Sequence, residues 1–295
     1  MQRILVTGHH GLIGSALTRY LQEVGYEVVG YDITGSEVMD ILDAETLDAT
    51  VASCTGIVHL AAVSRVVTGE RDPARCHLVN VQGTRNVLRA AAKAVNKHPW
   101  ILYGSSREVY GQAELLPVQE SAPFRPMNAY ARSKVAAEQI VIASKNEYNL
   151  KTSIVRFSGV YGSVADHGDR VLPAFARLAS QGGTLIVEGR ETLLDFTHVE
   201  DVAEGLLKVI QLLSSGEMVP TLHLVSGQGV LLTNLAEMAI DLTGRGKIKI
   251  VEPRAYDVKA FVGDPTQAEH IIGWRTAIPL RAGLGDLIKG FQESC

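Results

Sequence analysis

The stretch Thr7-Gly8-His9-His10-Gly11-Leu12-Ile13-Gly14-Ser15 decides the fold. It follows an apolar run over residues 4–7 that predicts a strand, and it leads into a helical pattern over residues 12–24. Glycines in such a turn let the backbone approach a pyrophosphate, and the N-terminus of the next helix offers free N–H groups and a positive dipole end. This strand–loop–helix setting strengthens a glycine pattern that would be weak evidence alone. The residues that we expect to bind a dinucleotide here are Gly8, Gly11, Leu12, Ile13 and Gly14.

A carboxylate at the end of the second predicted strand, residues 26–31, indicates which dinucleotide binds. Asp32 lies 18 residues after Gly14, close to the interval expected for the residue that binds the adenosine ribose. Its carboxylate can accept hydrogen bonds from both ribose hydroxyls and would repel a 2′-phosphate. No Arg or Lys occurs in residues 33–36 to bind that phosphate. We therefore expect NAD rather than NADP.

Strands and helices alternate through the first half of the chain, which indicates a parallel sheet with helices on both faces. Further strands are expected at 57–61, 100–105 and 153–157, and helices at 79–95 and 130–147. Helices at 170–180, 199–213 and 233–243 follow, with short strands between them. We predict a Rossmann-type, doubly wound α/β domain over residues 1–162 and a smaller α/β substrate lobe that contains most of residues 163–295. Residues 195–226 are expected to return to the first domain.

The composition excludes several classes of protein. The 295 residues carry a net charge of −4, whereas nucleic-acid binders usually have a basic balance. Three cysteines, Cys54, Cys76 and Cys295, have a spacing that fits no metal site, so we expect none. No apolar run approaches the roughly 18 residues that a membrane span needs, and the apolar N-terminus is too short for a signal peptide. We expect a cytoplasmic protein that binds neither nucleic acid nor membrane.

The segment Tyr130-Ala131-Arg132-Ser133-Lys134 opens the helix predicted over residues 130–147. Residues four apart share one helical face, so this phenol and ammonium project together. A tyrosine pKa of about 10 is too high for a base at neutral pH, but a nearby ammonium and an oxidised nicotinamide lower it. Ser106 ends a predicted strand at the carboxyl edge of the sheet, where ligands bind in such folds. Its hydroxyl can hold the substrate oxygen that Tyr130 deprotonates.

Further motifs occur along nearly the whole chain. They are Asp40-Ile41, His59-Leu60-Ala61-Ala62, Asn80-x-x-Gly83-Thr84, Ser105-Ser106-x-x-Val109-Tyr110-Gly111, Arg156-Phe157-Ser158-Gly159-Val160-Tyr161-Gly162 and Asp195-Phe196-x-x-Val199-x-Asp201-Val202-Ala203. With the glycine loop and Tyr130-x-x-x-Lys134, they make the chain resemble an extended short-chain dehydrogenase/reductase of the NAD-dependent epimerase/dehydratase family. Members of that family act on nucleotide sugars.

The resemblance implies a role for each matching residue. Ser106 matches the catalytic serine or threonine, Tyr130 the acid/base, and Lys134 the anchor of the nicotinamide ribose. The implied cofactor contacts are Asp40 and Ile41 at the adenine, Leu60, Ala61 and Ala62 along the cofactor path, Asn80 near its ribose, and Phe157, Ser158 and Val160. Family members often dimerise through the helices predicted here at 79–95 and 130–147, so we expect a homodimer.

The residues after Ser106 bear on the reaction. Where 4,6-dehydratases carry Thr-Asp-Glu, with the Asp protonating the leaving hydroxyl, this chain has Ser106-Arg107-Glu108. A guanidinium stays charged and is a poor proton donor, which argues against dehydration. UDP-glucuronate decarboxylases show a Thr-Ser-Glu pattern that is closer to this segment. Glu108 is therefore a candidate catalytic residue or a structural carboxylate.

Two diphosphate anchors usual in the family are replaced, one by Gly159 and one by Leu194. Arg170 lies near a position that is often Asn in epimerases. Arg254-x-x-Asp257 matches a motif in which the Arg grips the diphosphate and the Asp the nucleotide ribose. Arginine suits this task because its planar fork binds phosphate bidentately. We therefore expect Arg170, Arg254 and Asp257 to contact the substrate.

From this evidence we expect an NAD-dependent nucleotide-sugar epimerase that acts at C4 through a transient 4-keto sugar. The alternatives are a nucleotide-sugar 4-ketoreductase and a UDP-glucuronate-type decarboxylase or dehydratase on the same scaffold. A non-catalytic NAD-sensing protein is a remote alternative, because such proteins often lack the tyrosine or the lysine. Ser106, Tyr130 and Lys134 are all present here.

Overall fold

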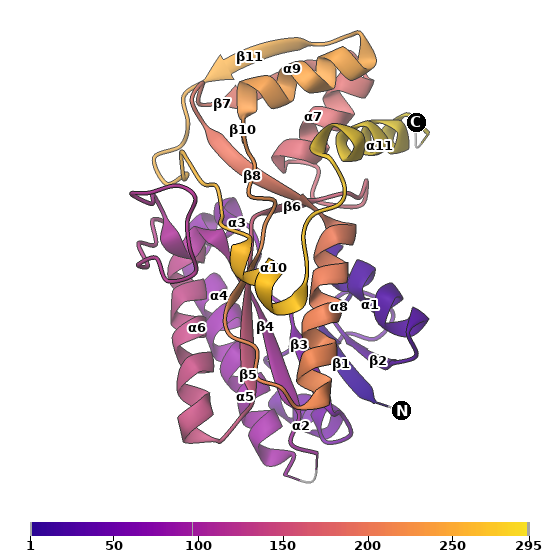
Figure 1. The fold of residues 1–295 in the computed structure, drawn as a ribbon, viewed down its shortest axis with the longest axis vertical. Coiled ribbons are helices and arrows are strands. Elements are labelled where there is room, and N and C mark those ends of the chain that lie inside the picture. Colours follow the sequence, from indigo (N-terminus) through magenta and orange to yellow (C-terminus); the bar gives the residue numbers. More distant parts are fainter. Residues whose placement is uncertain (1, 96, 294–295) are drawn as a thin grey trace.

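A parallel sheet of six strands lies at the centre of the computed structural model, which describes residues 2–95 and 97–293 (Figure 1). The strand order is β2-β1-β3-β4-β5-β9. The strands are β1 (Arg3–Thr7), β2 (Glu27–Tyr31), β3 (Gly56–His59), β4 (Trp100–Ser106), β5 (Thr152–Phe157) and β9 (Leu222–Leu224). The order reverses at β1, which is the pattern of a doubly wound Rossmann sheet. The predicted fold class is therefore confirmed.

Helices cover both faces of this sheet, and alternate side chains of the strands pack against them. α1 (Leu12–Glu23) and α8 (Val199–Ser215) share an apolar core with Ile4 and Val6 of β1. α2 (Ala44–Val51), α5 (Gly83–Lys93) and α6 (Ala129–Glu147) share the opposite core with Leu5. Because helices cover both faces of the sheet, a site can form at its carboxyl edge, where the polar strand ends lie.

The second lobe lies above the sheet in Figure 1 and has its own apolar core. It contains a three-stranded sheet of order β10-β8-β6 and a parallel pair of β11 and β7. The strands are β6 (Gly159–Tyr161), β7 (Thr184–Glu188), β8 (Leu193–His198), β10 (Gly229–Leu231) and β11 (Lys247–Val251). The helices that follow residue 162, apart from α8, are α7 (Val171–Ser180), α9 (Leu232–Thr243), α10 (Thr266–Ile272) and α11 (Leu280–Glu293).

The chain passes between the lobes more than once. β8 belongs to the upper sheet, whereas α8 packs against α1 and β9 pairs with β5 in the central sheet. α10 contacts both α8 and β9. The division near residue 162 and the return over 195–226 stay predictions about domain organisation.

The segment between β3 and α5 is more broken than the sequence pattern indicates. It contains α3 (Val66–Arg71), α4 (Pro73–His77) and a π-helical turn, Leu78–Gln82, before α5 begins. The helix expected over 79–95 is thus a π-helical turn followed by an α-helix. A further short 3₁₀ turn, Arg107–Tyr110, follows β4 and carries residues of the site.

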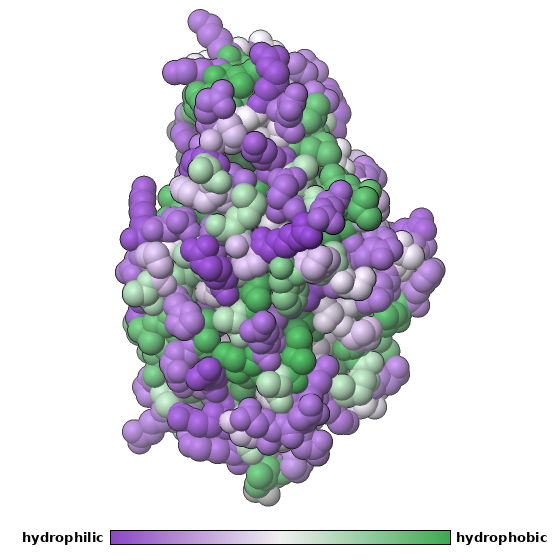
Figure 2. All heavy atoms as spheres, turned by 90° about the vertical axis from the view of Figure 1, so that its left-hand side faces the viewer, coloured by the Kyte–Doolittle hydropathy of each residue, from purple (hydrophilic) through white to green (hydrophobic). Residues whose placement is uncertain are grey.

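Figure 2 shows the face on the left of Figure 1, where α6 lies. Hydrophobic side chains are interspersed with hydrophilic ones on its lower half. Leu78 and Ile142, on elements that contact each other, are 44% and 48% exposed. The homodimer through residues 79–95 and 130–147 stays a prediction. Within the described residues, each helix is too short or too polar to cross a bilayer.

Candidate active site

A cavity of about 640 Å³ lies between the two lobes, over the carboxyl edge of the sheet. Its volume is in the usual range for small-molecule sites. Residues from the glycine loop, from the end of β4, from α6 and from the upper lobe line it together. Of the residues singled out from the sequence, Gly8, Gly11, Leu12, Ile13, Gly14, Leu60, Ala62, Ser106, Glu108, Tyr130, Lys134, Phe157, Ser158, Val160, Arg170, Arg254 and Asp257 line this cavity.

The glycine loop closes tightly on itself at one end of the cavity. Gly8 has φ +72°, and a Cβ there would lie 2.8 Å from the backbone nitrogen of Ala61. A Cβ on Gly14 would lie 2.2 Å from the carbonyl oxygen of Gly8. Gly11 precedes α1 without a side-chain cap, so the first N–H groups of the helix stay available to an anion. This cradle fits the diphosphate of a dinucleotide.

Gly14→Ala is expected to weaken NAD binding at least about tenfold, because the added Cβ also meets the Cα of His9 at 2.7 Å and the loop must move away from the helix. Calorimetric titration of NAD measures this loss. The matched control is Gly285→Ala on α11, where a Cβ meets nothing within 4 Å. NAD affinity of Gly14→Ala within threefold of the parent would contradict the predicted role of the loop.

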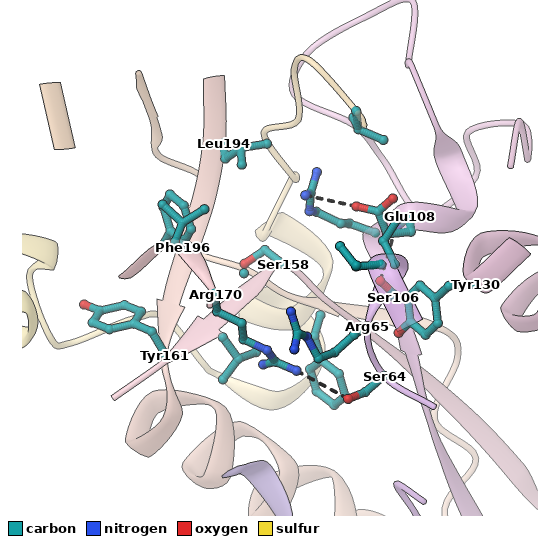
Figure 3. Close-up of a pocket in the computed structure, with 18 of the residues that line it drawn as sticks. Ser64, Arg65, Ser106, Glu108, Tyr130, Ser158, Tyr161, Arg170, Leu194 and Phe196 are labelled. Atoms are coloured by element: carbon teal, nitrogen blue, oxygen red, sulfur yellow. Dashed lines mark hydrogen bonds and ion pairs between the residues drawn. The ribbon is translucent and has the colours of Figure 1, made fainter. Parts of the chain in front are cut away.

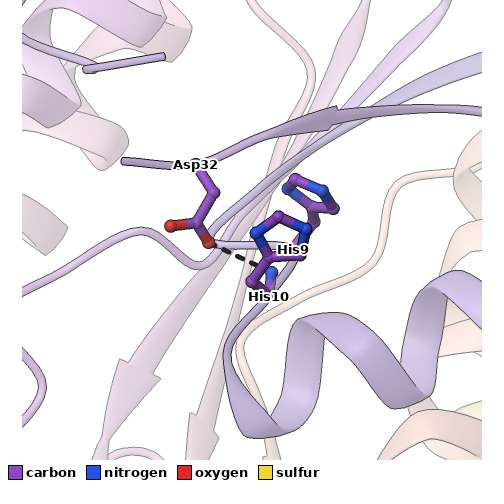
Figure 4. Close-up of side chains that lie close together, drawn as sticks. All are labelled: His9, His10 and Asp32. Atoms are coloured by element: carbon purple, nitrogen blue, oxygen red, sulfur yellow. Dashed lines mark hydrogen bonds between the residues drawn. The ribbon is translucent and has the colours of Figure 1, made fainter. Parts of the chain in front are cut away.

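Asp32 lies directly after β2 and beside the glycine loop, as predicted (Figure 4). One carboxylate oxygen accepts a hydrogen bond from the backbone N–H of His10 at 3.0 Å, and the other accepts from the backbone and hydroxyl of Thr34. These bonds lower the pKa of Asp32 against the opposing effect of burial. A carboxylate held in its charged form at this position can accept hydrogen bonds from ribose hydroxyls.

The same close-up shows His9 and His10 next to Asp32, with one potential ligand atom from each within 4.8 Å of the others. This grouping is not evident from the sequence, because Asp32 lies 22 residues from His10 along the chain. Asp32 already uses both oxygens within the loop, and the Nδ1 of His10 contacts Thr34. The contact of Asp32 with the cofactor ribose stays a prediction.

Several of the other residues predicted to contact the cofactor do not line the cavity. Asp40, Ile41, Ala61 and Asn80 lie outside the lining of the cavity. The side chain of Ile41 is buried in the core on the α5 side, and Asn80 ties the segment after β3 to Ser133 of α6 through a 2.8 Å hydrogen bond. Asn80 thus positions the wall of the site, and its contact with the cofactor ribose stays a prediction, as do those of Asp40, Ile41 and Ala61.

The three residues of the predicted reaction centre meet at the other end of the cavity. Figure 3 shows Ser106 at the end of β4 beside Tyr130, which comes from the first turn of α6. A hydrogen bond with Ser106 lowers the pKa of Tyr130, but burial dominates and raises that pKa to about 12. Ser106 and Arg170 are the groups that lower it most, whereas we had expected Lys134 to do so.

Lys134 is 4% exposed and lies one turn after Tyr130. Its Nζ donates a 2.8 Å hydrogen bond to the carbonyl oxygen of Gly104 and lies 4.8 Å from the ring centroid of Tyr103. Burial lowers the pKa of Lys134 to about 8, so the ammonium persists at neutral pH. The geometry fixes the Lys134 side chain at the carboxyl edge of β4, where a nicotinamide ribose can meet it.

Glu108 is buried and structural contacts hold it in place. One oxygen pairs with Nη2 of Arg107 at 3.0 Å, and the other accepts a 3.0 Å hydrogen bond from Asn128, the N-cap of α6. It faces the cavity beside Ser106 and Tyr130 in Figure 3. Glu108 therefore acts as a structural carboxylate in this structure, and its catalytic role stays a prediction.

The predicted substrate arginines also have protein partners. Arg254 pairs with Asp257 at 2.8 Å and with Glu188 at 2.9 Å. Arg170 lies 3.6 Å from Asp166 and donates to Ser64 at 3.4 Å (Figure 3). Gly159 cannot carry a larger residue in this structure, because a Cβ would lie 2.6 Å from the ring of Phe196. The cavity thus keeps arginines at its rim although two usual anchors are replaced.

The sequence interpretation missed several lining residues. Arg65 and Lys259 line the cavity, and Arg65 pairs with Asp169 at its rim. Arg107, which the sequence marks only as a poor proton donor, has a side chain that is 15% exposed and lines the cavity. In all, seven cationic and four acidic side chains line it, so the site favours an anionic ligand. The positive charge of Arg107, next to Ser106, is the sequence feature that could have indicated an anionic ligand.

A glycine-loop Rossmann fold with Ser106, Tyr130 and Lys134 in one cavity defines a dinucleotide-dependent enzyme of the short-chain dehydrogenase/reductase class. Residues 4–220 match the model of the NAD dependent epimerase/dehydratase family. The chain belongs to this family, and NAD is its cofactor.

Known proteins of similar sequence and structure catalyse different reactions. GDP-6-deoxy-D-mannose reductase of Pseudomonas aeruginosa is 28% identical, over 99% of this chain and 98% of that protein. UDP-glucuronic acid decarboxylase 1 of Xenopus tropicalis is 27% identical, over 99% and 72%. The solved UDP-glucose 4-epimerase of Thermotoga maritima, with UDP-glucose, has a TM-score of 0.90 and 26% identity, over 99% of both chains. Because these identities are nearly equal, the residues of the site, rather than the overall similarity, distinguish between these reactions.

Proposed function

We propose that this protein is a nucleotide-sugar epimerase that inverts the configuration at C4. The observation that carries the proposal is the pairing of Ser106 with the buried phenol of Tyr130, next to an Arg107 that cannot act as an acid. One acid/base group is sufficient to take a proton from a hydroxyl and return it. Dehydration needs a second acid at the position of Arg107.

Each residue of the centre has a defined task in this proposal. The Tyr130 oxygen takes the proton of the sugar 4-hydroxyl and later returns it, while the Ser106 hydroxyl holds the same sugar oxygen. NAD⁺, when bound, would supply the hydride acceptor and donor for C4, and its positive ring would oppose the effect of burial on the pKa of Tyr130. Lys134 holds the cofactor ribose. The cavity leaves room for the sugar to present its other face before the hydride returns.

A 4-ketoreductase is the second candidate, supported by the 28% identity to a nucleotide-sugar reductase over almost the full length of both proteins. It would use the same Ser106, Tyr130 and Lys134, but it would consume one reduced cofactor in each turnover. A decarboxylase would additionally release carbon dioxide. These reactions differ in their products rather than in their catalytic groups.

The test is a panel of UDP-, dTDP-, GDP- and CDP-sugars incubated with the purified protein and NAD and followed by NMR. We expect conversion of one sugar into its C4 epimer, with no net change in NADH absorbance and with NAD retained through purification. Stoichiometric use of NADH or NADPH with a 4-keto sugar would establish the reductase instead. Loss of water or of carbon dioxide would show dehydration or decarboxylation.

A further inference from the structure

We propose that Arg107 binds a carboxylate at C6 of the sugar, so that the substrate is a nucleotide-linked uronic acid. This inference rests on the proposed function only for the placement of the C4 oxygen at Ser106. Nothing in the family assignment specifies the substituent at C6.

The first support is the state of the Arg107 guanidinium. It is 15% exposed, its Nη2 pairs with Glu108, and its Nη1 is buried without a hydrogen-bond partner among the described residues. The guanidinium lies over the ring of Phe261, with 5.5 Å between Cζ and the ring centroid, which fixes its plane. A buried cation with an unused donor is costly unless an anion completes its pairing. A carboxylate suits this planar fork.

The second support is the position of Arg107 in the cavity. It directly follows Ser106, the residue proposed to hold O4. In a pyranose, C5 and its C6 substituent are adjacent to C4, whereas the diphosphate on C1 is on the opposite side of the ring. A side chain next to the O4 contact can therefore reach the C6 group or the C3 hydroxyl, and a cation with an unused donor favours an anionic group at C6. The diphosphate is left to arginines at the rim, such as Arg170 and Arg254.

The third support is the charge balance beside the reaction centre. Glu108 alone would repel a carboxylate, but its ion pair with Arg107 and its hydrogen bond from Asn128 neutralise and hold it. The unit formed by Arg107 and Glu108 is thus neutral and keeps one donor free. A neutral hydroxymethyl group at C6 would offer that donor one hydroxyl oxygen, but neither a negative charge nor the second oxygen that suits the planar fork.

The experiment compares UDP-glucuronate with UDP-glucose, or the corresponding uronate and hexose pair for whichever nucleotide the panel selects. We expect the parent enzyme to prefer the uronate at least tenfold in kcat/KM. Arg107→Met should lower kcat/KM about 100-fold for the uronate and at least tenfold less for the hexose, so that the preference for the uronate is lost. Arg107→Lys should restore part of the preference, because it keeps the charge but loses the fork.

Equal losses on both sugars would overturn the proposal, because they would show that Arg107 contacts the diphosphate or only supports Glu108. A parent enzyme that prefers the hexose would overturn it too. Calorimetric titration of the NAD-loaded Tyr130→Phe variant with both sugars measures the binding preference independently of turnover. Selective binding of the uronate without C4 inversion by the parent enzyme would refute the proposed function but support the Arg107 contact. C4 inversion by the parent enzyme without that selectivity would support the proposed function and refute the Arg107 contact.

Discussion

Tyr130→Phe is expected to lower kcat roughly 10³-fold and to leave NAD binding unchanged. The substitution removes only the hydroxyl that exchanges the proton of the sugar, and general acid/base groups contribute about 10² to 10⁴ in rate. The aromatic ring of Tyr130 is buried, with 7% of the residue exposed, so phenylalanine keeps the packing of the first turn of α6. Turnover measured by NMR and NAD content after purification check the two parts of this result.

The matched control is Tyr148→Phe, which removes a hydroxyl just beyond the C-terminal end of the same helix. Tyr148 is 46% exposed and lies outside the cavity, so this variant should retain the parent activity. Activity of Tyr130→Phe within a few-fold of the parent would mean that another group carries the proton. A loss of NAD together with activity would instead show that the phenol supports the cofactor rather than the chemistry.

The local parts of the fold and site could be predicted because short sequence intervals determine them. The turn around Gly8 and Gly14 follows from a positive φ and from close backbone contacts, and glycine is the residue that tolerates both. Tyr130 and Lys134 face the same way because they are four residues apart in α6. The parallel central sheet with helices on both faces follows from the alternation of strand and helix.

Features that depend on distant contacts could not be predicted in the same way. The guanidinium of Arg107 is held between Glu108 and the ring of Phe261, which lies in the upper lobe far along the chain. The partners of Glu108 include Asn128, which comes near Glu108 only because α6 packs against β4 in the folded protein. The pKa of Tyr130 depends on burial by the whole site, which no short interval of sequence determines.

Glu138→Gln is expected to lower the free energy of unfolding by about 3–5 kcal/mol, the typical cost of removing one partner of a buried ion pair. Glu138 is fully buried in α6 and pairs with Arg156 of β5 through both carboxylate oxygens, at 2.9 and 2.6 Å. The substitution leaves the Arg156 guanidinium, 5% exposed, without a counter-charge in the core. Equilibrium unfolding in urea, followed by circular dichroism, measures the change.

The comparison that tests the cause is Glu204→Gln, which breaks an ion pair of 3.4 Å with Lys208 on the exposed side of α8. Solvent screens that pair, so its loss should cost less than about 0.5 kcal/mol. Arg156 also donates to Tyr110 and to the backbone of Glu120, so these neutral contacts remain in Glu138→Gln and cannot account for the loss. If the two variants lost equal stability, the buried pair would contribute no more than an exposed one. The attachment of the catalytic helix to β5 would then rest on apolar packing alone.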